Sequence, residues 1–190
     1  MQNSDKNVVS IPWNKGKLVG QKHPLKLKEL WEIRIRLELA EDKRGLALFN
    51  LAIYSKLRDW DLVKLKVSDV VQANRVKSMA IIMQQKTHRP VQFDITEHTR
   101  VSLEDWIKSA NLKSDLYLFT SRLHWSQHLS TRQYGSLVEK WVKSIGLDPA
   151  GYGTHSMRRT KATLICRKTK NLRAVQLLLG HSKLESTVRY

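Results

Sequence analysis

The segment 42–55 most constrains how this chain can fold, because its apolar side chains cover most faces of a helix. Those side chains are Leu46, Phe49, Leu51, Ile53 and Tyr54. A helix that is apolar nearly all round is too hydrophobic for a surface position and belongs in the interior. We therefore expect a helical domain built around this segment.

The flanking segments predict the rest of the fold. Helical spacing of apolar residues predicts helices over 25–40 and 96–109, and a short helical turn is expected after residues 57–62. Ser130 and Gln133 match a capping box and open a helix that Gly146 ends. Alternation predicts strands over 78–85 and 91–95. The fold class is α+β but mostly α, a helical core with one small antiparallel hairpin. Tryptophans on the periodic stripes, such as Trp31, Trp106 and Trp141, are expected in the core.

The charge of the chain indicates a polyanionic partner. Lys and Arg outnumber Asp and Glu by 34 to 17, which gives a formal net charge of +17. Nucleic acid is the leading candidate. No apolar run approaches the roughly 20 residues needed to span a bilayer, so a membrane is not expected. The polar N-terminus, without a signal peptide, and the single Cys166 favour a cytoplasmic protein. Residues 1–24 are basic and aperiodic, and we expect a mobile arm there.

Two polar residues begin a helix near the C-terminus. Thr154 can cap a helix starting at His155, and His155 and Arg158 then share a face of its first turn. Free N–H groups and the helix dipole favour an anion at such a helix start. A bland interpretation stays open, because Arg158, Arg159 and Lys161 could form a solvated basic face.

The last residues place a histidine and a tyrosine near each other. Apolar spacing predicts a helix over 172–179 that Gly180 ends, so His181 lies at a turn. Ser182 and Glu185 match a capping box for a last short helix to Tyr190. His181 and Tyr190 could converge on one phosphate if that helix folds back.

These motifs resemble those of the tyrosine recombinase (phage integrase) family. The family has H-x-x-R, L-G-H and tyrosine motifs in this order, and the matching residues are His155-Ser156-Met157-Arg158, Leu179-Gly180-His181 and Tyr190. Upstream, Leu57-Arg58-Asp59-Trp60-Asp61-Leu62 resembles the family's arginine box, with Asp61 where Glu is common. Lys86 is the best match for a lysine that the family has on a β-hairpin. The resemblance covers residues 25–190 and implies the catalytic-domain fold.

The resemblance also implies a reaction and its participants. The Tyr190 hydroxyl would attack a phosphodiester of double-stranded DNA and leave a 3′-phosphotyrosyl link, with no metal, ATP or other cofactor. Arg58 and Arg158 would hold the phosphoryl oxygens, His155 would accept a proton, His181 would hydrogen-bond the phosphoryl group, and Lys86 would protonate the leaving oxygen. DNA contacts are expected from His88, Arg89, Arg159 and Lys161. The family implies a homotetramer on synapsed DNA, and a free monomer stays possible.

Other functions remain open at this point. A bacterial site-specific recombinase or integrase of the nucleoid, a plasmid or a phage is the first hypothesis. The second is a catalytically silent or truncated DNA-binding relative that occupies or regulates recombination sites, and the third is a nicking-closing topoisomerase. We expect residues 25–190 to form the catalytic domain without a separate core-binding domain, ending at the nucleophile, which suggests truncation. The target sequence and the type of event are open.

Overall fold

The apolar segment 42–55 forms the central helix of the computed structural model, as predicted. Helix α2 (Lys43–Ser55) begins at Asp42, whose Oδ1 accepts a hydrogen bond from the Gly45 amide at 2.8 Å. Its Ala47, Leu48, Phe49, Leu51 and Ile53 side chains are all buried. Burial of each large apolar side chain stabilises the fold by about 1.5–3 kcal/mol. Helix α2 is therefore the element against which the others pack.

The structure describes residues 22–121, 127–171, 173 and 176. Besides α2, its elements in chain order are α1 (Leu27–Leu39), α3 (Asp59–Val63), α4 (Val67–Val70), β1 (Val71–Gln72), β2 (Arg75–Val76), β3 (Met79–Met83), β4 (Pro90–Asp94), α5 (Glu97–Ser109), α6 (Thr131–Ser144), the 3-10 turn η1 (Pro149–Gly151) and α7 (Thr154–Thr169). The helices predicted over 172–179 and 182–190 lie outside the described residues, apart from isolated positions.

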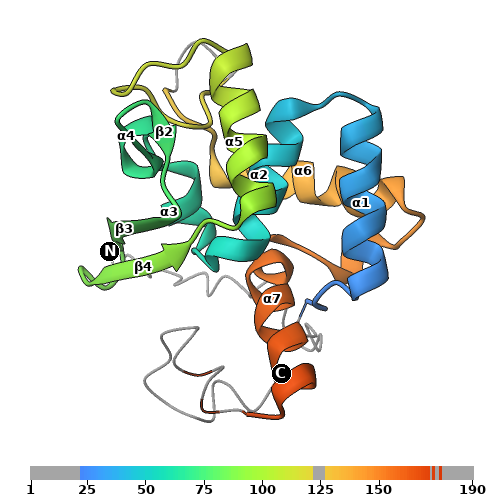
Figure 1. The fold of residues 1–190 in the computed structure, drawn as a ribbon. Coiled ribbons are helices and arrows are strands. Elements are labelled where there is room, and N and C mark those ends of the chain that lie inside the picture. The colour runs from blue at the N-terminus through green and yellow to red at the C-terminus, as the bar shows by residue number, and fades with distance from the viewer. Residues whose placement is uncertain (1–21, 122–126, 172, 174–175, 177–190) are drawn as a thin grey trace, which may run out of the picture.

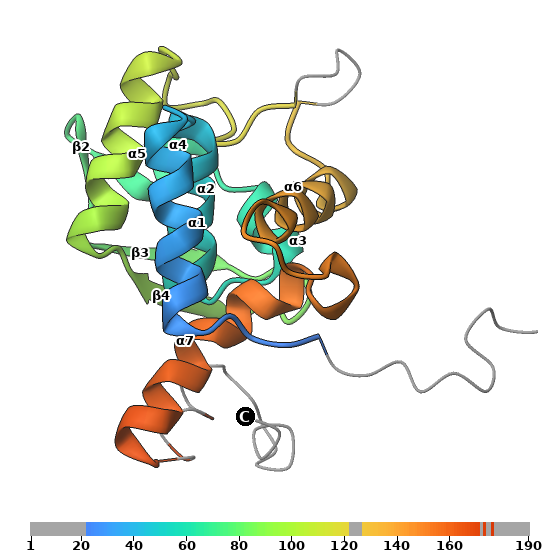
Figure 2. The same ribbon diagram turned by 90° about the vertical axis from the view of Figure 1, so that its right-hand side faces the viewer.

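Four elements surround α2. Helices α1, α5 and α7 and strand β4 all pack against it, and Figure 1 shows α2 between α5 and α1 with α7 below. Figure 2, turned by 90°, shows α1 in front of α2 and lying along it. A buried polar network joins three of these helices, because Asn50 accepts from Arg34 Nε at 3.1 Å and donates to Ser102 Oγ at 3.1 Å. Both bonds fix the relative positions of α1, α2 and α5.

Helix α1 turns a different face to the core than its tryptophan suggests. Its buried apolar residues are Leu30, Ile33 and Leu37, whereas Trp31 is 45% exposed. The expectation that Trp31 lies in the core is therefore wrong. The physical reason is the buried guanidinium of Arg34, which lies 4.6 Å from the Trp31 ring centroid and is covered by it. Trp141, in contrast, is buried as predicted.

The predicted hairpin is confirmed. Strands β3 and β4 pair antiparallel, with Met79 opposite Asp94 and Met83 opposite Pro90. A second, unpredicted antiparallel pair joins β1 and β2 through a turn in which Ala73 and Asn74 both have positive φ. Two strands of two residues each are too short to show an alternating pattern in the sequence. The fold class, mostly helical with small antiparallel sheets, is confirmed.

Helix α6 follows the sequence prediction at both ends. Ser130 Oγ accepts from the Gln133 amide at 3.1 Å, and Gln133 Oε1 accepts from the Ser130 amide at 3.0 Å, which completes the capping box. Gly146 follows the helix with φ of 78°, a conformation that glycine adopts without strain. Helix α6 packs against α3 and α7 and thereby supports both.

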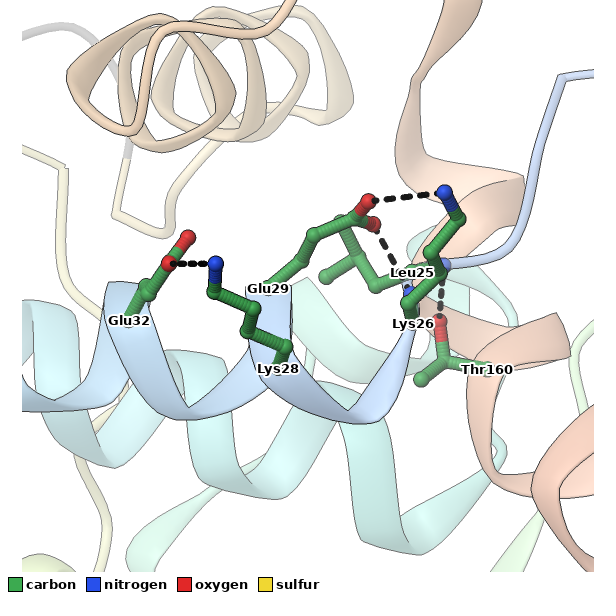
Figure 3. A network of polar contacts seen from close by, with 6 residues as sticks. All are labelled: Leu25, Lys26, Lys28, Glu29, Glu32 and Thr160. Carbon is green, nitrogen blue, oxygen red and sulfur yellow. Dashed lines mark hydrogen bonds and ion pairs between the residues drawn. The ribbon is translucent and has the colours of Figure 1, made fainter.

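Helix α7 begins differently from the prediction. Gly153 is its N-cap, and Thr154 is the first helical residue rather than the cap. The expected Thr154 cap is wrong because its hydroxyl donates to Asp59 instead. Deeper in the helix, Thr160 Oγ1 accepts from the Leu25 amide at 3.0 Å and donates to the Ser156 carbonyl at 2.7 Å. Figure 3 shows this contact where the start of α1 meets α7.

The segment before α1 also contacts the C-terminal part of the chain. The His23 amide donates to the Gly151 carbonyl at 2.8 Å, and Lys22 Nζ donates to the Ala150 carbonyl at 2.6 Å. Residues 1–21 of the predicted arm lie outside the described residues. Within the part of the chain that the structure describes, no helix is long and apolar enough to cross a membrane.

Replacing Thr160 with valine tests how far the junction of α1 and α7 stabilises the domain. Thr160 is fully buried, and Thr160→Val leaves the Leu25 amide without its acceptor. We expect the free energy of unfolding in urea to fall by about 1–3 kcal/mol. Thr169→Val is the matched control, because Thr169 makes the same bond to a carbonyl of α7 but is exposed. Equal losses in both variants would contradict the prediction.

Candidate active site

Arg58 lies where the chain leaves the central helix. Helix α2 ends at Lys56, which has φ of 59°, and Leu57 is buried. Arg58 then takes an extended conformation as the N-cap of α3. Its half-buried guanidinium donates from Nη1 to Gln84 Oε1 at 3.1 Å. The exit from α2 therefore sets the position of Arg58 against the β3–β4 hairpin.

Gln84 organises the tip of that hairpin. Its side chain is buried, and Oε1 also accepts from Thr87 Oγ1 at 2.9 Å. The backbone N–H of Gln84 donates to the backbone carbonyl of Arg89 at 3.0 Å, and the backbone carbonyl of Gln84 accepts from the backbone N–H of His88 at 2.9 Å. Residues 84–89 thus form a closed tip, in which Lys86, His88 and Arg89 are exposed.

Asp61 provides a second link between α3 and the hairpin tip. Its Oδ1 accepts from the Gln85 amide at 3.0 Å. The carboxylate is buried, and Oδ2 has no hydrogen-bond partner among the described residues. The carboxylate of the arginine box therefore holds the strand end that leads to Lys86.

The start of α7 is joined to the same short helix. Thr154 Oγ1 donates to Asp59 Oδ2 at 3.2 Å. Asp59 follows Arg58, and Thr154 precedes His155, so the bond brings the Arg58 and His155 segments together. His155 is exposed, and Arg158, three residues later, is half-buried. Residues three apart lie on the same helix face, so both belong to the face at this end of α7.

The predicted site residues fall into three groups. Arg58, His155 and Arg158 come from elements tied directly to α3, and Lys86 lies on the hairpin tip that Arg58 and Asp61 hold. His88 and Arg89 lie on the same tip. His181 and Tyr190 lie outside the described residues.

Arg159 and Lys161, predicted to contact DNA, have partners within the protein. Arg159 Nη1 donates to the Lys22 carbonyl at 2.8 Å, next to η1. Lys161 Nζ donates to the Tyr54 carbonyl at 3.3 Å and lies 5.3 Å from the centroid of the Tyr54 ring. Lys161 is thereby held against the end of α2.

Positive charge accumulates between α2, α7 and the end of β4. Burial, then the nearby Lys161 and Arg158 cations, lower the pKa of Lys56, and the Asp94 carboxylate opposes this shift. Burial likewise lowers the pKa of Lys161 against the effect of Asp94. The charged forms of both lysines are therefore disfavoured in the free protein. An anion bound beside these lysines would stabilise their charged forms.

Sequence reasoning missed Gln84, Asp59 and Lys56. Gln84 could have been found, because Ala80, Ile82 and Gln84 share the inward phase of β3 and its continuation, and a glutamine in that phase needs a partner. No sequence pattern joins Asp59 to Thr154, which is 95 residues away. Within the described ranges, no three His, Cys, Asp or Glu side chains are grouped as metal ligands would be.

Comparison with known proteins identifies the family. The model of the phage integrase family matches residues 26–190. The chain belongs to the phage integrase family, as its motifs predicted.

Individual relatives agree with this assignment. The chain is 27% identical over 164 residues to the probable integrase/recombinase YoeC of Bacillus subtilis (strain 168), covering 86% of this chain and 85% of YoeC. It is 28% identical to tyrosine recombinase XerC of Psychromonas ingrahamii, covering 77% of this chain and 48% of XerC. The chain thus spans about half the length of that relative.

Solved structures confirm the fold. The crystal structure of the XerH site-specific recombinase bound to its difH substrate, a pre-cleavage complex, superimposes with a TM-score of 0.68 at 22% identity. The match covers 88% of this chain and 49% of XerH. At this level of identity, the similarity establishes the tyrosine recombinase catalytic-domain fold.

Replacing Gln84 tests the link between Arg58 and the hairpin tip. Gln84→Leu removes the oxygen that accepts hydrogen bonds from Arg58 and Thr87. It keeps a side chain of similar volume in the buried position. We expect amide hydrogen exchange at Thr87 and His88 to accelerate about fivefold, as for the loss of hydrogen bonding worth ~1 kcal/mol. Gln92→Leu, at an exposed position of the same hairpin, should leave these rates unchanged. Unaltered exchange in Gln84→Leu would contradict the link.

The pH dependence of stability tests the charge accumulation. Because the folded pKa of Lys161 lies below its ordinary value of 10.5, the unfolded chain binds more protons between the two pKa values. This lysine therefore makes stability rise with pH through that window. As pH increases toward 10.5, the free energy of unfolding of the wild type should rise relative to that of Lys161→Met. Parallel pH profiles in urea denaturation would contradict the shift.

Proposed function

We propose that this chain is the catalytic domain of a site-specific DNA recombinase that cleaves and rejoins DNA through a 3′-phosphotyrosyl intermediate. The observation that carries the proposal is the convergence on α3. Arg58 holds the hairpin tip that carries Lys86, and the residue after Arg58 holds the start of α7, which carries His155 and Arg158. In this proposal two guanidiniums, an imidazole and an ammonium group share one site, where they can bind a phosphoryl group and stabilise the charge that develops on it.

In the proposed reaction the oxygen of Tyr190 forms a bond to phosphorus as the bond from phosphorus to the DNA 5′-oxygen breaks. Arg58 and Arg158 bind the nonbridging oxygens, on which negative charge increases. His155 accepts the tyrosine proton, and His181 donates a hydrogen bond to the phosphoryl group. Lys86 gives a proton to the leaving 5′-oxygen. The bond energy is kept in the phosphotyrosyl link, so no ATP is consumed.

The other tyrosines support Tyr190 as the nucleophile. Tyr134 is buried, and burial together with the nearby Asp59 carboxylate raises its pKa. Burial and Glu29 raise the pKa of Tyr152. The Tyr54 hydroxyl accepts a hydrogen bond from Arg34, on the side of α1. Tyr117 packs against the ring of His128. A phenol with a raised pKa is a poorer source of the attacking phenolate.

Double-stranded DNA is the proposed partner. The net charge of +17 and the exposed His88 and Arg89 at the hairpin tip suit a phosphate backbone. Arg159 and Lys161 would add contacts along α7. The relative XerH was crystallised with its DNA substrate, which supports the same partner here. A homotetramer on synapsed DNA and a cytoplasmic site of action are part of the proposal.

A covalent-adduct assay tests the function. The full chain is incubated with a pool of nicked suicide duplexes of randomised core sequence, and adducts are separated on a denaturing gel. We expect an adduct with the wild type and none with Tyr190→Phe. Arg158→Ala should form adduct at least about 10²-fold more slowly, the usual cost of losing a group that stabilises transition-state charge, and should keep most of its DNA affinity.

Arg132→Ala is the control for the loss of an arginine, because Arg132 is exposed on α6. It should cleave like the wild type. Binding without any adduct would favour the DNA-binding relative that does not cleave, and an adduct that persists in Tyr190→Phe would disprove the assigned nucleophile. Relaxation of supercoiled plasmid without strand exchange would favour a topoisomerase.

A further inference from the structure

Lys56 occupies a backbone conformation that is costly for lysine. Its φ is 59°, in the left-handed region where glycine is favoured and a Cβ is crowded. Six other described non-glycine residues have positive φ, and all six are exposed: Glu41, Ala73, Asn74, His88, Asn111 and Lys170. Lys56 is half-buried. It therefore combines backbone strain with the desolvation of a charged side chain.

The side chain of Lys56 lies among other cations. Lys161 Nζ is 3.3 Å from the carbonyl of Tyr54, two residues before Lys56. Helix α7, which carries Lys161 and Arg158, packs against α2 throughout this region. The Lys56 ammonium is close enough to Lys161 and Arg158 for both to act on its charge. Asp94, at the end of β4, is the carboxylate that acts on both lysines.

Lys56 has no partner for its charge in the part of the chain that the structure describes. Its side chain makes no hydrogen bond to a described residue, and neither Lys56 nor Lys161 forms an ion pair with Asp94. Among the described residues, Lys56 and Lys161 therefore share a half-buried region with the single carboxylate that acts on both, Asp94. Like charges in such a region repel one another, and burial weakens the screening by water. A dianionic or polyanionic ligand would provide the missing negative charge.

We propose that Lys56 and Lys161 form a second phosphate-binding subsite, which holds a backbone phosphate of bound DNA next to the one gripped by Arg158. The inference rests on the proposed function for the place of Arg158. An ammonium group binds phosphate as a point charge and tolerates varied geometry. Such a subsite suits a neighbouring phosphate, which must be held in register but does not change during the reaction.

The test measures DNA affinity and stability in the same variants. Lys56→Gly and Lys56→Asn both remove the charge and keep residues that accept a left-handed backbone. We expect neither to lower the melting temperature of the full chain. For binding to a fluorescein-labelled 30-base-pair duplex, the magnitude of the slope of log K against log salt should fall by about 0.9. Over one decade of salt concentration, the affinity of the variant should therefore change about eightfold less than that of the wild type. Lys56→Arg should restore the slope.

Lys170→Gly is the matched control. Lys170 is also a lysine with positive φ at the C-cap of a helix, but it is exposed. Its replacement should change the backbone in the same way and leave the salt slope at the wild-type value. An unchanged slope in Lys56→Gly and Lys56→Asn overturns the subsite. So does an equal loss in Lys170→Gly, which would mean that any lysine removed from this basic chain has the same effect.

The proposal and the proposed function fail in different measurements. If the wild type forms no covalent adduct, the recombinase function fails, whereas the slope difference between Lys56→Gly and Lys170→Gly still tests the phosphate subsite. If the adduct forms but the slope difference is absent, cleavage proceeds without the subsite. A drop in melting temperature with an unchanged slope would mean that Lys56 serves the fold alone, which also overturns the proposal.

Discussion

The burial of α2 on every side is the constraint on which the rest of this structure depends. Helix α2 is packed against α1, α5, α7 and β4. The chain therefore changes direction sharply where α2 ends. The left-handed Lys56 makes this turn, and the buried Leu57 anchors it. Arg58 follows within two residues. The position of the first arginine of the candidate site is therefore a consequence of core packing.

The five-residue helix α3 carries more of the site than its length suggests. Arg58 at its N-cap bonds to Gln84, Asp59 in its first turn bonds to Thr154, and Asp61 bonds to the Gln85 amide. Two parts of the chain, the hairpin tip and the start of α7, are thus tied to one short helix. A helix this short gains little stability by itself, so these bonds and the burial of Leu62 and Val63 hold it in place. Loss of any one link should loosen the other two.

Local patterns in the sequence predicted the elements well, but not the contacts between them. The capping box at Ser130 and the alternating strands of the hairpin are short-range features, and the structure contains both. Periodicity could not show which of two apolar stripes of α1, one with Trp31 and one with Ile33, faces the core. In the structure Trp31 lies over the buried guanidinium of Arg34 instead of in the core. Thr154 looked like a helix cap because nothing nearby in the sequence points to Asp59. The failure at Thr154 came from a contact with a residue 95 positions away, whereas the failure at Trp31 came from Arg34 in the same helix.

For the candidate site, motifs in the sequence predicted charged residues but not the contacts that hold them. Arg58 and Arg158 stand out through motifs, whereas Gln84 is a neutral side chain whose importance comes from its two hydrogen bonds in a buried position. Neutral residues of this kind do not attract attention in a sequence with many lysines and arginines. They nevertheless determine whether a guanidinium is fixed or mobile before substrate binds. Fixed donors need no reorganisation when charge develops on a phosphate.

The half-buried lysines where α2, α7 and β4 meet would favour the binding of an anion. Lys56 and Lys161 at this junction are held partly out of water, and burial lowers the pKa of both lysines. A fold selected for stability alone would place glycine at the left-handed position of Lys56 and leave Lys161 in solvent. The proposed phosphate subsite would account for both lysines, because a bound anion would offset the repulsion between them.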